Sequence, residues 1–123
     1  MKDILSILVL SLMFCSCSGS DVKNYRLEVV AEYPHDTTSY TQGLFFKDGQ
    51  LYESTGLNGK STFRVVDLKT GKALRKLDFD KKYFVEGSVI FDANLYILTW
   101  ENKVVFIYDA ETLEYKSTHR YAR

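Results

Sequence analysis

The chain has 123 residues, of which 46% are hydrophobic and 15% aromatic, so it can build a packed core. Its 16 basic residues balance 16 acidic ones without long runs of one sign. The basic patch of a nucleic-acid-binding protein is therefore missing, and we expect no nucleic-acid partner.

The chain opens with an apolar leader. Lys2 precedes an apolar run over residues 4–14, which is typical of a secretory signal and too short to span a bilayer comfortably. A small residue before Cys17, with small and acidic residues after it, resembles a bacterial lipoprotein processing site; Cys15 is the weaker choice, and a plain secretory signal is the alternative. We therefore predict a leader over 1–17, export, and a lipid anchor in the bacterial cell envelope as the only membrane contact.

A polar linker over 18–24 separates the leader from a predicted domain over 25–123. Both cysteines precede this domain, which excludes a disulfide or a zinc–thiolate cluster inside it. Residues 25–33 alternate like a strand and end at Pro34. We interpret this run as an outer strand belonging to the last blade of a closed ring.

The remaining sequence repeats itself at a spacing of 44 residues, from Gln42 to Glu86. The paired segments are 42–46 with 86–90, 51–55 with 95–99 and, two residues out of step, 63–67 with 105–109. A period near this length with several short strands per copy indicates β-propeller blades. The predicted strands are 43–46, 51–56, 62–68 and 73–79 in the first blade, and 87–91, 95–100, 103–109 and 113–119 in the second. The fold class is thus all-β.

Two blades and one strand cannot close a ring, because propellers need about four to eight blades. The chain therefore looks truncated, and an open edge over 115–123 would leave backbone groups unpaired. We expect the active unit to continue past Arg123 or to close with a partner.

Glu53 is the clearest departure from the repeat. It stands where the second copy has Ile97, a position suited to a buried aliphatic side chain. Burial strips water from a carboxyl group and favours its neutral form, which suits a proton carrier. The alternative is a slipped register that leaves Glu53 facing solvent.

Two further positions are candidates for a site. Gln42 and Glu86 each precede the glycine that opens an innermost strand, so both side chains should point to one mouth of the central channel. The alternative is that they bond neighbouring backbone. Trp100 aligns with Gly56 in the first blade; a lone tryptophan is usually core, but at a strand end it could wall a pocket.

These residues lie in motifs that resemble the plant and bacterial type of glutaminyl-peptide cyclotransferase, also called glutamine cyclotransferase. The motifs are YTQGL at 40–44, LYESTGL at 51–57, FVEG at 84–87 and LTW at 98–100. The resemblance implies a five-bladed propeller that converts an N-terminal glutamine into pyroglutamate and releases ammonia. Its partner would be a peptide or protein substrate that begins with glutamine.

The resemblance also implies roles for individual residues. Glu53 would carry the proton from the attacking amine to the leaving nitrogen, and Gln42 would hydrogen-bond the carboxamide. Tyr40 and Trp100 would wall the site, while Glu86 would either bind the substrate amine or support the blade. An asparagine and a lysine expected in later blades have no counterpart in this chain.

The resemblance has departures and a rival. Tyr40 replaces a frequent phenylalanine and Val85 a usual glycine, which could alter the turn before Glu86. No cofactor is implied, and no metal site is expected because His35 and His119 are isolated. The rival function is a non-catalytic exported propeller that binds peptide or glycan.

Overall fold

The structure is a computed structural model that describes residues 22–122. The chain divides after Val30, and the unit Ala31–Arg123 carries all the strands found in the described range. They are β1 (Thr41–Lys47), β2 (Gln50–Thr55), β3 (Thr62–Val66), β4 (Ala73–Asp78), β5 (Val85–Phe91), β6 (Asn94–Thr99), β7 (Val104–Asp109) and β8 (Tyr115–Arg120). No helix within residues 22–122 is long and apolar enough to cross a membrane.

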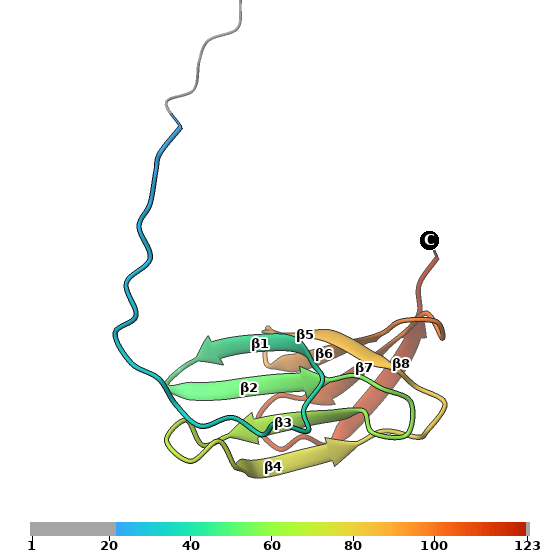
Figure 1. Ribbon diagram of the computed structural model, residues 1–123. Helices are drawn as coiled ribbons and strands as arrows, with labels where there is room; N and C mark the ends of the chain where they lie inside the picture. Colours follow the sequence, from blue (N-terminus) through green and yellow to red (C-terminus); the bar gives the residue numbers. More distant parts are fainter. Residues whose placement is uncertain (1–21, 123) are drawn as a thin grey trace, which may run out of the picture. The chain divides into compact units, whose positions relative to one another are not determined.

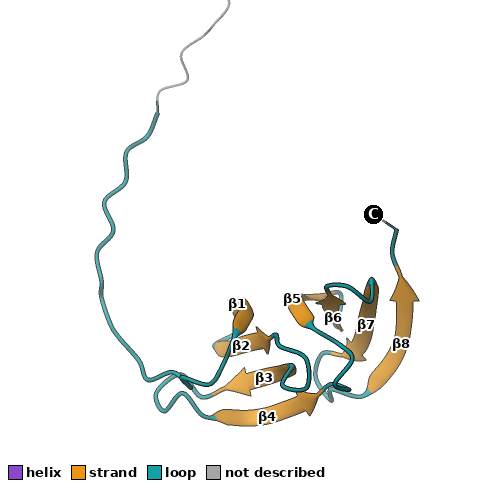
Figure 2. Ribbon diagram, turned by 45° about the vertical axis from the view of Figure 1, so that its right-hand side comes forward, coloured by secondary structure: helices purple, strands orange, loops and turns teal. Residues whose placement is uncertain are grey.

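The eight strands form two four-stranded antiparallel sheets, with strand orders β1-β2-β3-β4 and β5-β6-β7-β8. Each sheet is a simple meander, and the two sheets fan apart from β1 and β5 toward β4 and β8 (Figures 1 and 2). We call the β1–β4 sheet the first blade and the β5–β8 sheet the second blade. All eight strands of the two predicted blades are confirmed.

The two-residue offset in the repeat has a local cause. Glu53 pairs with Arg64 across β2 and β3, whereas Ile97 pairs with Phe106 across β6 and β7. The connection between β2 and β3 covers residues 56–61, and its counterpart between β6 and β7 covers only 100–103. The shorter loop shifts the second copy without changing the pairing.

A strand predicted over residues 25–33 is absent, because the structure assigns no strand before Thr41 in the described range. An alternating pattern is not sufficient for a strand, because a strand exists only when its backbone groups pair with a neighbour. Within residues 22–122, each sheet consists of its four strands alone, and neither includes this segment.

The core lies between the two blades. Its buried members are Phe63, Val65, Val85, Leu95, Ile97, Val104, Phe106 and Leu113. Tyr52 joins this core by stacking on Phe45 and Phe63, with ring centroids 4.9 Å and 6.1 Å away. On β2 the side chains of Tyr52 and Ser54 therefore face the second blade, and Glu53 between them faces the opposite side of the first blade.

The inner ends of the two blades approach closely. A Cβ atom added to Gly43 would lie 2.5 Å from Ser54 Oγ and 3.2 Å from Gly87 Cα, so only glycine fits there. The Ser54 hydroxyl donates a hydrogen bond of 2.6 Å to the carbonyl of Glu86. These contacts fix β5 against β1 and β2.

The turns that open the two blades differ in one residue. Asp48 and Gly49 connect β1 to β2 with φ of 50° and 79°, and Asp92 and Ala93 connect β5 to β6 with φ of 47° and 59°. Two positive φ angles match the twist of a two-residue hairpin. Alanine is strained in this region, whereas glycine is not.

Ala93→Gly should therefore stabilise the full-length protein by about 0.5–1 kcal/mol, because relief of the left-handed strain exceeds the added chain entropy. Gly49→Ala, at the matching turn of the first blade, should destabilise by a similar amount. Urea unfolding measures both. Midpoints that move in the same direction for the two variants would contradict this explanation.

Candidate functional site

Two irregularities in strand pairing place Gln42 and Glu86. The register of β1 against β2 shifts between Thr41 and Gly43, and that of β5 against β6 shifts between Val85 and Ser88. Extra residues of this kind turn a side chain away from the regular alternation and are frequent beside active sites. The half-buried side chains of Gln42 and Glu86 are thus released from the ladders at the same end of neighbouring strands.

The polar ends of these two side chains are available to a ligand. Among the described residues, no hydrogen bond or ion pair engages the Gln42 amide or the Glu86 carboxyl. Within residues 22–122, a side chain bonds Glu86 only at its backbone carbonyl, which accepts from Ser54. Within the described residues, the Gln42 and Glu86 side chains therefore do not bond neighbouring backbone, which was the alternative.

A row of three aromatic rings lies beside these groups. Tyr40 meets Phe84 edge-on at 6.2 Å, and Phe84 meets Trp100 edge-on at 5.5 Å. The backbone repeats one arrangement in both blades: Gly56 N donates to Tyr40 O at 2.8 Å, and Trp100 N donates to Phe84 O at 2.9 Å. Tyr40 and Trp100 remain 52% and 45% exposed, so both can line a binding surface.

The row explains why the repeat has Trp100 in one blade and Gly56 in the other. A Cβ atom on Gly56 would lie 2.6 Å from Phe84 Cζ and 3.1 Å from Gln42 Cγ. Glycine therefore admits the Phe84 ring from the second blade. Phe84 was not predicted as a site residue, although its alignment with Tyr40 at the repeat spacing was a usable signal.

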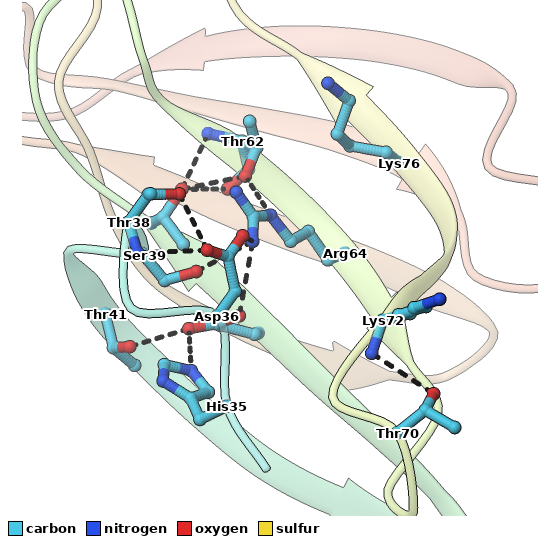
Figure 3. Close-up of polar contacts among 12 residues, drawn as sticks. His35, Asp36, Thr38, Ser39, Thr41, Thr62, Arg64, Thr70, Lys72 and Lys76 are labelled. Atoms are coloured by element: carbon cyan, nitrogen blue, oxygen red, sulfur yellow. Dashed lines mark hydrogen bonds and ion pairs between the residues drawn. The ribbon is translucent and has the colours of Figure 1, made fainter.

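Glu53 is buried, as its alignment with Ile97 predicts: the two residues are 1% and 0% exposed. Its surroundings, however, are polar rather than aliphatic. Thr41 Oγ1 donates to Glu53 Oε1 at 2.6 Å, and His35 Nε2 lies 2.9 Å from the same oxygen (Figure 3). The alternative that Glu53 faces solvent is wrong, because the residue is buried, with polar groups as its neighbours.

Arg64 completes this polar cluster. Its NH1 group donates to Asp36 Oδ2 and to Ser39 Oγ, both at 2.7 Å, and lies 4.0 Å from Glu53 Oε2 (Figure 3). Hydrogen bonds from Thr38 and from the Arg64 guanidinium lower the pKa of Asp36 to about 2, so its carboxyl is ionised at neutral pH. The cluster thus attaches residues 35–41 to the face of the first blade opposite the core.

The partners of Glu53 were not predicted from the sequence. His35 was treated as isolated, and neither Thr41 nor Arg64 was singled out. Arg64 could have been found from the cross-strand pairing of β2 with β3, because it lies directly opposite Glu53. His35 could not, because it comes from a segment without regular structure.

Two other expectations concern metals and lipid. Within residues 22–122, no group of three or more His, Cys, Asp or Glu side chains could hold a metal ion. Cys17, the predicted lipidation site, and the leader over 1–17 lie outside the described residues.

The chain is similar to known proteins along most of its length. A family model described as glutamine cyclotransferase matches residues 4–123. A curated glutaminyl-peptide cyclotransferase of Arabidopsis thaliana is 44% identical over 89 residues, which are 72% of this chain and 28% of the plant protein. The crystal structure of Myxococcus xanthus glutaminyl cyclase superposes with a TM-score of 0.68 and 30% identity over 78% of this chain and 40% of that one.

The chain spans less than half the length of either relative, at 28% and 40%. The superposition nevertheless covers 78% of this chain at a TM-score and identity that support a common architecture. The β-propeller fold predicted from the repeat is confirmed.

The contact between Gly56 and Phe84 can be tested by a double-mutant cycle in the full-length protein. Gly56→Ala should destabilise by about 1–3 kcal/mol because the added methyl group overlaps the ring. In a Phe84→Ala background the same change should cost much less, since the ring is gone. Urea midpoints give the four free energies.

Gly87→Ala is the matched control, because a Cβ atom at Gly87 meets nothing within 4 Å. It should leave the midpoint nearly unchanged. Additive effects of the changes at 56 and 84 would show that the ring does not determine the glycine.

Proposed function

Since this chain belongs to the glutamine cyclotransferase family, we propose that the protein converts the N-terminal glutamine of peptides into pyroglutamate and releases ammonia. The observation that supports this most directly lies at the starts of β1 and β5. There the Gln42 amide and the Glu86 carboxyl, which have no partners in the described chain, lie beside three aromatic rings. The substrate would be a peptide or protein that begins with glutamine.

The reaction requires no covalent bond between the enzyme and its substrate. The α-amine attacks the γ-carboxamide carbon of the same residue, so the enzyme must hold a cyclic conformer and move protons. The amine has a pKa near 8, so a fair fraction is unprotonated and nucleophilic at neutral pH. The demanding step is the loss of the amide nitrogen, which must leave as ammonia.

Gln42 and the aromatic row suit the binding of a glutamine side chain. The Gln42 amide has both a donor and an acceptor, which match those of a substrate carboxamide. Tyr40 and Trp100 would cover the apolar methylene groups and keep water from the reacting carbon. A residue that contacts the substrate must be at least partly exposed, and Gln42, Tyr40 and Trp100 all are.

The proton carrier must reach the reacting atoms, and we assign this role to Glu86. As a carboxylate it would take a proton from the attacking nitrogen as the new C–N bond forms. It would return that proton to the amide nitrogen as the old C–N bond breaks, which yields pyroglutamate and ammonia. Glu53, which the sequence favoured for this role, has a side chain only 2% exposed and already bound by His35 and Thr41.

We also propose that the protein is exported and held on the bacterial cell envelope by a lipid on Cys17. The support is the leader itself, with Lys2, the apolar run over 4–14 and the small residues around the cysteine. An exported enzyme of this kind would meet peptide substrates outside the cytoplasm. This location is independent of the proposed chemistry.

The chemical role of Glu86 predicts that Glu86→Gln lowers kcat by about 100-fold or more, because the amide cannot accept the proton. Ammonia release from a glutamine-led peptide by the full-length protein measures it. Glu114→Gln, an exposed position in the connection that precedes β8, is the control and should keep normal rates. An active Glu86→Gln variant would refute the assignment, and an inactive wild type would refute the proposed function.

The anchor is tested by labelling cells with an alkyne analogue of palmitate. The wild type and Cys15→Ser should take up label and sediment with membranes, whereas Cys17→Ser should do neither. Label that persists in Cys17→Ser would move the site to Cys15. Absence of label from the wild type would favour a plain secretory signal.

A further inference from the structure

The buried carboxyl of Glu53 has no part in the chemistry proposed for Glu86, yet it is the centre of a polar cluster. Burying a carboxyl group is costly unless hydrogen bonds and opposite charges compensate. Two of those partners, His35 and Thr41, come from one short segment, residues 35–41, which precedes Gln42. The third, Arg64 on β3, donates to Asp36 and Ser39 of the same segment. A cluster concentrated on that segment suggests that the segment must be held in place.

We propose that Glu53 is a positioning residue that holds residues 35–41 so that Tyr40 and Gln42 are presented correctly to the substrate. The expected effect on substrate binding rests on the proposed function, whereas the attachment of residues 35–41 by Glu53 does not. Glu53 acts through Thr41 and His35 and does not touch the substrate.

The geometry supports two attachments by the same oxygen. Glu53 Oε1 accepts from Thr41 Oγ1 at 2.6 Å and lies 2.9 Å from His35 Nε2. It therefore holds both ends of the segment.

Arg64 attaches the middle of the segment. Its guanidinium lies 4.0 Å from Glu53 Oε2 and donates to Asp36 and Ser39 at 2.7 Å each. Arg64 Nε also donates to Thr62 Oγ1 at 2.9 Å, which fixes the guanidinium on β3. Together the carboxylate and the guanidinium hold four residues of the segment.

Gln42 needs such support because the strand ladder does not provide it. Thr41 still pairs with Thr55, but the register shifts immediately after it, so Gln42 lies outside the regular pairing. The direction of its side chain then depends on how firmly Thr41 is held. The Thr41 hydroxyl bond to Glu53 is therefore one residue away from a proposed substrate contact.

Tyr40 depends on the same attachment. Its carbonyl accepts from Gly56 N at 2.8 Å, and its ring packs on Phe84. Residues 35–40 belong to no strand. Without the polar cluster, that single backbone bond and ring contact would remain to orient Tyr40.

The kinetic test uses the full-length protein with Glu53→Gln, Thr41→Val and Thr41→Ser. Loss of position without loss of the proton carrier should raise KM for a glutamine-led peptide by about 10-fold and change kcat by less than about 3-fold. The pH profile of kcat should keep its shape, and Thr41→Ser should restore the wild-type KM because it keeps the hydroxyl. Val65→Ala removes core packing on the other face of the first blade and controls for lower stability without a change in KM.

A second measurement does not depend on activity. Hydrogen–deuterium exchange in peptides covering residues 36–42 should speed up by about 10-fold in Glu53→Gln and Thr41→Val, relative to the other strands of the first blade. Val65→Ala should show no such local increase. This measurement decides the structural content of the proposal even if the wild type releases no ammonia, an outcome that would refute only the proposed function.

The proposal is overturned if both variants exchange like the wild type over residues 36–42. It is equally overturned if Glu53→Gln loses 100-fold or more in kcat with an unchanged KM, since that result marks a proton carrier. Should Glu53→Gln fail to fold, Thr41→Val decides alone, because it removes the attachment and leaves the carboxyl in place.

Discussion

The close approach of β1 and β2 to β5 is the constraint on which the rest of the structure depends. Gly43 has no side chain to keep the strands apart, and the Ser54 hydroxyl satisfies the Glu86 carbonyl across the contact at 2.6 Å. A carbonyl left without a partner in this close contact would cost free energy, so the serine contributes to the contact together with the glycine. Because these atoms meet, Gln42 and Glu86, which precede Gly43 and Gly87, lie at the starts of two adjoining strands.

The repeat predicted much of the fold, because strand alternation and turn residues are local properties. Strand limits agree with the structure to within two residues, and the offset between the copies follows from one shorter loop. The strand over 25–33 was not found, since its existence depends on a partner that the local pattern cannot show. Local sequence is thus a good guide to each blade and a poor one to the chain that leads into it.

The site was predicted less completely, for a related reason. Comparison of the two copies identified Glu53 as buried and Trp100 as unusual, because both differ from an aligned residue. The polar partners of Glu53 come partly from residues 35–41, most of which belong to no strand, so neither alternation nor cross-strand pairing could reveal them. Two carboxyls that look alike in sequence therefore have different settings: Glu53 is enclosed and bonded, whereas Glu86 is reachable.

The contact of Gly56 with Phe84 has a consequence for how such a protein can be divided. The glycine belongs to one blade and the ring to the next, so the aromatic row is built across the boundary between repeat units. An exchange of single blades between related propellers would transfer half of this contact and separate it from the residue that makes room for it. A unit that keeps this contact must include the Gly56 side of the first blade and the Phe84 side of the second. The unit that carries function therefore differs from the unit that repeats in the sequence.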